Sequence, residues 1–239
     1  MTQIQNIKGN IERWNTIRNT DLGLKHLSSG FGFEISEADF LTWRDKDANS
    51  QIHVYLGIDE NDQTRFYLVD SISDATNDDS TIEQHLIEKG FTKDNLPPDQ
   101  GAQIIPELKV QQEDGMKRAF KWFLYCNVWF KNMQTEWQGT RPELKDQSGV
   151  VRVFSLPLAN FIELFTNPKI HSAFVFFGIK DRISLDGIDR DNEIELLVAG
   201  VDYLQALETI ANMDIQMKNV TIPHPPFPIE YSLFSLLKS

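Results

Sequence analysis

Residues 33–58 read FEISEADFLTWRDKDANSQIHVYLGI, and residues 154–179 read FSLPLANFIELFTNPKIHSAFVFFGI, so that the second stretch follows the first at an offset of 121. The alignment needs no gap, and most aligned positions keep their apolar or polar character. We interpret the match as an internal duplication, in which one α+β unit occurs twice in the chain. The identical pairs include Phe33 and Phe154, Phe40 and Phe161, Val54 and Val175, Gly57 and Gly178, and Ile58 and Ile179.

Beyond residue 179 the two copies still match, but the offset changes. Leu68 aligns with Leu197 at an offset of 129. A polar insertion at residues 182–190 of the second copy explains the change, because insertions between equivalent elements fall in loops. The alternative is that two unrelated amphipathic segments of the same type align by chance.

Each copy is predicted to contain a long helix. Apolar residues recur at three- and four-residue spacing from Ile4 to Ile17 and predict an amphipathic helix over residues 3–19. Gly9 weakens this helix by about 1 kcal/mol. The counterpart spans residues 113–137, where apolar residues occupy far more than one stripe. We therefore expect the second helix to be covered on several sides, as the central column of the molecule.

A short helix is predicted after each long one. Ser36 and Asp39 have the spacing of a capping box, and Ile35 and Phe40 have the spacing of a hydrophobic staple. In the second copy Pro157 takes the place of the capping serine and presets the backbone dihedral for a helix. The residue that begins the helix differs between the copies, but both sequences predict a helix at this point.

A β-hairpin and a further helix complete each copy. Alternating apolar residues on either side of polar turns predict the strands. Capping pairs that begin at Thr81 and at Asp202 predict the helices. The predicted strands are residues 51–58 with 64–70 and residues 173–180 with 193–200, and the predicted helices are residues 82–89 and 203–212.

The expected fold class is therefore α+β, with an internally duplicated unit of helix, short helix, β-hairpin and helix. We expect the hairpins to form an antiparallel sheet across a pseudo-twofold axis, packed with helices. The halves are residues 1–112 and 113–239. They should pack intimately, because the long helix of the second half is apolar on all sides.

The composition limits the partners of this chain. Its 239 residues include 35 Asp or Glu and 23 Lys or Arg, which gives a formal net charge of −12. The electrostatic field of this negative charge repels nucleic-acid backbones and anionic lipids, so we predict neither nucleic acid nor a membrane as partner. A basic protein or a cation suits it better, although solubility alone also explains an acidic surface. With no signal-peptide pattern and the single cysteine Cys126, we expect a cytoplasmic protein.

The insertion in the second copy carries the densest group of carboxylates. Asp186, Asp189, Asp191 and Glu193 are candidate metal ligands, because hard oxygen donors suit calcium. The pattern does not complete an EF-hand loop, since Ile194 stands where that loop needs glycine. A solvated hairpin tip is the alternative interpretation.

The sequence contains no catalytic motif. The five histidines lack zinc-site spacing, and there is no Walker loop, dinucleotide-binding fingerprint or nucleophile elbow. We predict no cofactor. His53 and Tyr55 are candidate ligand-binding residues, because they share one face of the first predicted strand and face away from Val54 and Leu56. A groove beside that strand would bring them together.

A proline-rich run lies near the carboxyl end, at residues 223–228. Its prolines favour an extended polyproline II segment, so Pro225, Pro226 and Phe227 are candidate partner-binding residues. The alternative is a rigid strap packed on its own domain, since apolar residues from Tyr231 onwards are typical of a docking segment.

The carboxyl-terminal part of the chain resembles a known group of sequences. The stretch FFGI at residues 176–179, the stretch LLVAGVD at residues 196–202 and the proline-rich run resemble a group of uncharacterised bacterial proteins with a similar hairpin and a Pro-rich carboxyl end. The resemblance implies a bacterial source and no particular activity.

These features predict a non-enzymatic, acidic binding or interaction protein whose partner is another protein or a second copy of itself. The alternative is a small-ligand binder or an enzyme with a site in the groove between the two copies. An exposed apolar patch would favour the first function, and a concave pocket with convergent polar groups would favour the second.

Overall fold

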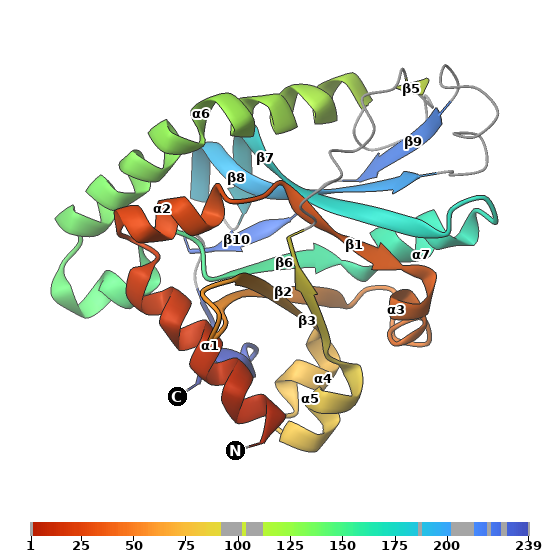
Figure 1. The fold of residues 1–239 in the computed structure, drawn as a ribbon, viewed down its shortest axis with the longest axis horizontal. Coiled ribbons are helices and arrows are strands. Elements are labelled where there is room, and N and C mark those ends of the chain that lie inside the picture. The colour runs from red at the N-terminus through yellow and green to blue at the C-terminus, as the bar shows by residue number, and fades with distance from the viewer. Residues whose placement is uncertain are drawn as a thin grey trace.

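A computed structural model describes residues 2–91, 102–103, 112–185, 188–201, 213–218, 221–225 and 229–238, and Figure 1 shows the fold. The described helices are α1 (Gln3–Ile17), α2 (Asp21–Leu27), α3 (Glu37–Leu41), α4 (Ser71–Ala75), α5 (Asp79–His85), α6 (Gln112–Gly139) and α7 (Leu158–Thr166), with 3-10 turns η1 (Pro142–Gln147) and η2 (Ser235–Leu237). The described strands are β1 (Gly32–Ser36), β2 (Gln51–Ile58), β3 (Thr64–Asp70), β4 (Ile87–Gly90), β5 (Ala102–Gln103), β6 (Val153–Pro157), β7 (Ser172–Leu185), β8 (Ile188–Val201), β9 (Met213–Lys218) and β10 (Ile222–His224).

The strands form two sheets. One sheet, here called the β7 sheet, has the order β1-β7-β8-β9-β5, and the other, the β2 sheet, has the order β10-β6-β2-β3-β4. All neighbouring strands are antiparallel except the pair of β5 and β9. The predicted α+β class, with antiparallel sheets packed against helices, is confirmed. The expectation of one continuous sheet is wrong, because each hairpin belongs to its own sheet.

The sheets are joined by an exchange of strands between the halves of the chain. β1, from the first half, pairs with β7, and β6, from the second half, pairs with β2. Gly32 lies opposite Phe176, and Val153 lies opposite Tyr55. These two pairings become identical when residue numbers are shifted by 121. The equal registers support the duplication, which itself stays a prediction.

The second strand of each hairpin shows that the sequence alignment is wrong by one residue. Val54 pairs with Leu68, whereas Val175 pairs with Val198. Under the proposed duplication, the counterpart of Leu68 would therefore be Val198 and not Leu197. The correction has a physical basis, because a shift of one residue moves every side chain to the other face of a strand.

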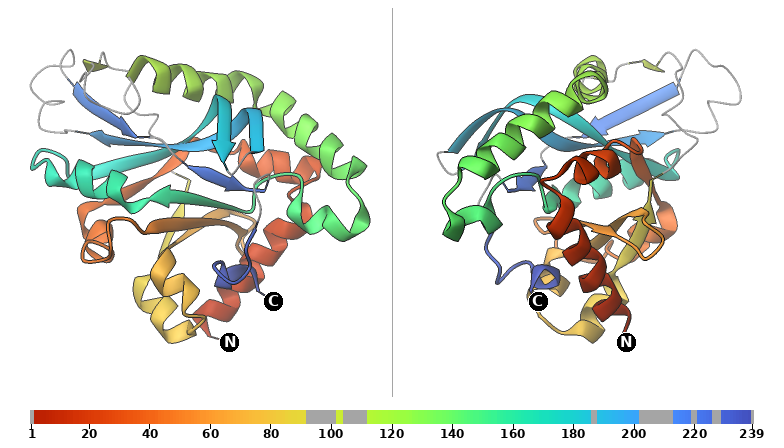
Figure 2. Two further views of the ribbon diagram at one scale, coloured as in Figure 1. Left: turned by 180° about the vertical axis from the view of Figure 1, so that it is seen from behind. Right: turned by 60° about the vertical axis from the view of Figure 1, so that its left-hand side comes forward.

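The facing sides of the two sheets enclose the larger core. Val54 and Phe66 contribute from the β2 sheet, and Val175 and Leu196 contribute from the β7 sheet. Helices pack against both sheets: α6 lies over β7 and β8, while α1, α4 and α5 lie against β2 and β3 (Figures 1 and 2). The larger core also includes side chains of α6, since Trp122 and Trp129 belong to it and the ring centroid of Trp122 lies 5.0 Å from that of Phe177.

One glycine in each hairpin lets the covering helix approach. A Cβ atom at Gly57 would lie 3.2 Å from the backbone of Asn10 in α1. A Cβ atom at Gly178 would lie 3.4 Å from the Cβ atom of Arg118 in α6. The glycine pair that the repeat aligns thus occupies equivalent places, each beneath the long helix of its half.

The local signals for the short helices are confirmed. The hydroxyl of Ser36 accepts a hydrogen bond from the Asp39 backbone N–H at 3.2 Å, and the Asp39 carboxylate accepts one from the Ser36 N–H at 2.7 Å. This reciprocal capping box begins α3. Pro157 precedes the first residue of α7 and makes no side-chain cap. The hairpin of residues 51–58 and 64–70 is also confirmed, as β2 and β3.

The helix predicted over residues 82–89 is wrong. Asp78 caps α5, accepting a hydrogen bond from the Thr81 N–H at 3.0 Å, so the helix begins earlier than the sequence suggests. The following residues form β4, in which Ile87 pairs with Leu68 of β3. Pairing with an open sheet edge overrides the local helical pattern here. The helix predicted over residues 203–212 lies outside the described residues.

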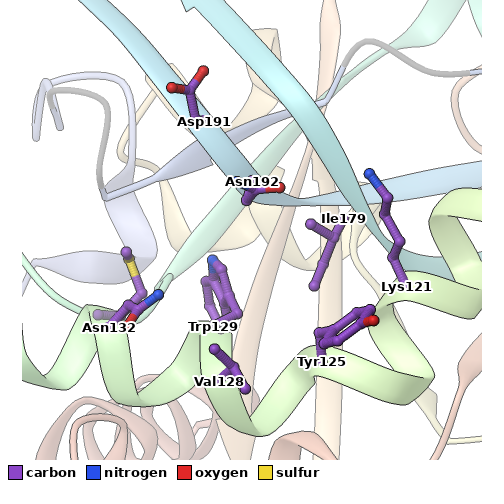
Figure 3. Close-up of a pocket in the computed structure, with 9 residues that line it drawn as sticks. Lys121, Tyr125, Val128, Trp129, Asn132, Ile179, Asp191 and Asn192 are labelled. Atoms are coloured by element: carbon purple, nitrogen blue, oxygen red, sulfur yellow. The ribbon is translucent and has the colours of Figure 1, made fainter.

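The described residues of the insertion in the second hairpin, 182–185 and 188–190, are strand rather than loop. β7 and β8 continue to pair through it, and Ser184 lies opposite Asp189. The second hairpin is therefore a longer ribbon than the first. Asp191 and Asn192 of this ribbon lie beside α6 (Figure 3).

The carboxyl-terminal segment packs against the β2 sheet beside α1. Phe234, Leu236 and Leu237 are buried in a second core cluster with Ile7 and Ile11. The docking segment predicted after the proline-rich run is therefore confirmed for residues 229–238.

Candidate functional site

The helix α6 presents an apolar side to the solvent. Its buried side carries Trp122, Trp129 and Met133, which pack into the larger core. The opposite side carries five of the six exposed large residues of this helix, here called the α6 face, and it includes Phe120 at 62% and Phe123 at 59% exposure. The sixth, Tyr125, lines the cleft described below. The expectation that this helix is covered on several sides is therefore wrong for the single chain. The α6 face consists of Met116, Phe120, Phe123, Leu124 and Val128.

The aromatic rings of the α6 face are ordered by their neighbours. The ring centroids of Phe120 and Phe123 lie 6.3 Å apart, and that of Phe31 lies 6.1 Å from Phe123, both in stacked arrangements. With roughly 200 Å² for each aromatic side chain, the half-exposed residues of the face offer on the order of 500 Å² of apolar surface. Contiguous exposed apolar patches of this size are often functional.

A cleft of about 330 Å³ opens beside the α6 face, between α6 and the β7–β8 hairpin (Figure 3). Tyr125, Val128 and Trp129 line it from the helix, and Ile179 and Asn192 line it from the hairpin. Polar groups stand at its edge, where Lys121 and Asp191 extend from the two elements. The cleft is mainly apolar, so it suits an apolar or aromatic group better than an ion.

The backbone of the hairpin is unusual at this cleft. Asn192 has a φ of 54°, in the left-handed region that non-glycine residues seldom adopt. Asparagine tolerates this conformation better than most residues. The deviation interrupts the regular strand beside the cleft and places the Asn192 side chain in its wall (Figure 3).

A buried carboxyl group lies under α6 next to the cleft. Glu193 is 1% exposed, and burial raises its pKa to about 7, against the opposing charge of Arg190. The Nε atom of Arg190 lies 3.5 Å from Oε1 of Glu193, while Oε2 makes no hydrogen bond. The indole N–H of Trp129 lies close enough to lower the pKa of this carboxyl but misses hydrogen-bond geometry.

Ion pairs attach α6 to β8. Arg190 pairs with Glu136 near the end of α6, and Nη1 of Arg118 lies 3.4 Å from the buried carboxylate of Glu195. A buried ion pair is costly to break, because removal of one partner leaves an uncompensated charge. These contacts hold the helix in one orientation on the sheet, and that orientation decides which of its sides is exposed.

Glu193→Gln should flatten the pH dependence of stability. A carboxyl whose pKa is raised on folding binds its proton more tightly in the folded state, so stability is greatest at low pH and is lost as pH rises through about 7. We expect the free energy of unfolding of the variant to exceed that of the wild type by about 2 kcal/mol at pH 8 and to equal it at about pH 4, below the ordinary carboxyl pKa of 4.5. Urea titrations at both pH values measure this. Asp191→Asn, which removes an exposed carboxylate next to the cleft, is the matched comparison. A pH profile of Glu193→Gln that runs parallel to that of the wild type would contradict the assignment.

His53 and Tyr55 lie together, but inside the protein. Both are buried, at 3% and 0% exposure, and neither lines the α6 cleft. Nδ1 of His53 lies 2.6 Å from Oδ2 of Asp74, and the Tyr55 hydroxyl donates to the same oxygen. Burial raises the pKa of Tyr55 well above its usual value, and the Asp74 charge acts in the same direction. The expected groove is thus filled by a polar cluster, which the sequence indicated only through its His and Tyr.

The remaining candidate residues do not converge on a site. Among the described residues no group of three or more His, Cys, Asp or Glu side chains could hold a metal ion. Asp191 lines the cleft and Glu193 is buried, while Asp189 lies in β8 and Asp186 lies outside the described residues.

The proline-rich run is described only in part. Pro225 is buried at the end of β10. Pro226 and Phe227 lie outside the described residues.

Two more clefts lie elsewhere, each within the first half of the chain. One of about 460 Å³ is lined by His26, Thr64 and Phe91, and another of about 530 Å³ by Asn10 and Glu60 with their neighbours. None of the three clefts joins the two halves, so the groove predicted between the copies is not among them.

Comparisons with known proteins return nothing: no protein-family model, curated protein or solved structure matches this chain. In the described part of the chain no helix is long and apolar enough to cross a membrane. Any functional assignment therefore depends on the geometry of the α6 face and its cleft.

Proposed function

We propose that this chain is a non-enzymatic binding protein that engages a partner protein through the α6 face. The supporting observation is the exposure of five large apolar residues on one side of a helix whose other side is fixed to the sheet. A single exposed apolar residue is common on protein surfaces and does not indicate an interaction site, but a contiguous apolar patch is costly to leave in water. The adjoining cleft adds a concave feature that can receive an anchoring side chain.

The chemistry beside the face favours binding over catalysis. The buried Glu193 carboxyl is flanked by Arg190 and Trp129, and none of the described residues that line the cleft is a serine, threonine or cysteine. A partner helix is the natural counterpart, because an amphipathic helix places its apolar residues into a groove or onto a face at three- and four-residue spacing. The chain's net charge of −12 disfavours nucleic acid as a partner of the molecule as a whole.

Phe123→Glu should weaken the binding of helical peptides at least tenfold, because a central aromatic residue contributes more than 1 kcal/mol at such interfaces. The measurement is a selection of amphipathic helical peptides on the purified wild-type protein, followed by fluorescence titration of each variant. Ile72→Glu, which changes an exposed residue of α4 on the far side, is the matched control and should bind as the wild type does. Peptides that bind Phe123→Glu undiminished, or a selection that yields none, would remove the α6 face as a binding surface.

A second candidate is a small apolar ligand in the cleft, favoured by the cleft's volume and by the indole of Trp129 in its wall. Pockets of roughly this size bind small molecules when a few polar groups accompany an apolar lining. Such a ligand should be displaced by Val128→Trp, which fills the cleft from the helix side. Ligand binding that Val128→Trp leaves unchanged would place the ligand elsewhere.

A further inference from the structure

We propose that the partner of the α6 face is a second copy of this chain, so that two copies pack their α6 helices antiparallel across a twofold axis. This inference rests on the proposed function and adds the identity of the partner. An isologous contact needs one self-complementary surface, because each residue meets its symmetry mate or a neighbour of it. The α6 face must therefore match itself in charge, length and area.

The charges around the face are already neutralised within the chain. Each basic side chain of α6 lies beside an acidic group of the same chain, so the rim contributes little to the acidic excess of −12. A strongly basic partner would find few unpaired carboxylates there, whereas an identical rim meets it without net repulsion. The pairs are Lys117 with Asp114, Arg118 with Glu195, Lys121 with Asp181, and Lys131 with Asp21.

The length of the face suits a helix pair. Residues 116–128 span about 18 Å of helix at 1.5 Å per residue, which is more than three turns. In an antiparallel pair centred on this segment, Phe120 of one copy meets Leu124 of the other, and Met116 meets Val128. Large apolar residues are thus opposite one another along the whole contact, as packing of two helix surfaces requires.

The area is sufficient for a specific dimer. The apolar side chains offer on the order of 500 Å² per copy, and the flanking polar residues of two helices enlarge the contact toward the roughly 800 Å² that each partner buries in a standard interface. α6 is also the outermost layer above β7 and β8, so a second copy reaches it without meeting the β2 sheet (Figure 2). A dimer would bury the α6 face, and the sequence predicts that this helix is covered on several sides.

Analytical ultracentrifugation of the full chain over a range of concentrations tests the proposal. The wild type should reach twice the 27.5 kDa of one chain. Phe123→Glu should raise the dimer dissociation constant on the order of 100-fold, because it places a charge near the axis in both copies. Ile72→Glu should dimerise as the wild type does. Circular dichroism and thermal unfolding, unchanged in Phe123→Glu, show that the variant is folded.

Cross-linking tests the orientation. In a Cys126→Ala background, Leu124→Cys should be joined efficiently by a short bis-maleimide, whereas Ile72→Cys should not. A wild type that stays monomeric, or a Phe123→Glu variant that still dimerises, overturns the proposal. If the wild type is monomeric while helical peptides still bind the α6 face, the partner is another protein and the proposed function stands. If peptides also fail to bind, both proposals fall.

Discussion

Asp74→Ala is expected to lower the free energy of unfolding by about 4 kcal/mol, the largest effect we predict for a single side chain. Asp74 is fully buried in α4, where its carboxylate accepts hydrogen bonds from the Tyr55 hydroxyl and from both the backbone N–H and the hydroxyl of Ser235. His53 lies 2.6 Å away as a further donor. Removal of the carboxylate leaves these groups unpaired in a region closed to water.

The same contacts explain how the carboxyl-terminal segment is held. Ser235 belongs to η2, and the ring of Phe234 beside it packs at a tilt against that of His53, with ring centroids 4.4 Å apart. Asp74 thus links α4, β2 and the last residues of the chain at one point. Asp74→Ala should release this segment, and proteolysis after Tyr231 should accelerate along with the loss of stability.

Urea titration at neutral pH measures the effect, with two comparisons. Asp79→Ala changes an exposed residue near Lys8, and it should cost less than about 0.5 kcal/mol. Ser235→Ala removes one hydroxyl donor and should cost about 1 kcal/mol. A loss below about 1 kcal/mol for Asp74→Ala would show that the cluster does not hold the segment.

Local features of the fold could be predicted from the sequence, whereas contacts between distant segments could not. The capping box of Ser36 and Asp39 is complete within four residues, and the first hairpin follows from alternation around a short turn. The pairing of β1 with β7 joins residues far apart in the chain, and nothing within either segment indicates its partner. The same limit explains the missed β4, whose strand form depends on the edge of β3.

The candidate site shows the same division. The composition of α6 predicted a long helix, but a helix that is apolar all round does not indicate which side the sheet will cover. Glu193 was expected near a solvated hairpin tip, and it is buried because the hairpin continues under α6. A signal for Asp74 did exist: His53 and Tyr55 on one face of an apolar strand require a hydrogen-bonding partner. The sequence could not say which of its many carboxylates supplies it.

The exchange of strands between the halves can be tested with two Gly→Ala variants, one at Gly32 and one at Gly9. Their effects on the free energy of unfolding should have opposite signs. Gly32 begins β1, and a Cβ atom there would lie 2.0 Å from the carbonyl oxygen of Val175 and 2.7 Å from the Cα atom of Phe176 in β7. These are backbone atoms of a central strand, so neither can move without disturbing the sheet. We expect Gly32→Ala to lower the free energy of unfolding by about 3 kcal/mol.

Gly9→Ala provides the matched control within the same experiment. Gly9 lies in the middle of α1, and a Cβ atom there meets nothing within 4 Å. Alanine has a higher helix propensity than glycine and leaves the unfolded chain with fewer backbone conformations. The free energy of unfolding of this variant should therefore rise by about 1 kcal/mol. Urea titrations of both variants against the wild type give the two signs. A neutral Gly32→Ala would mean that β1 does not approach β7 as closely as the exchanged pairing requires, and the link between the two halves would have to be sought in β6 and β2 alone.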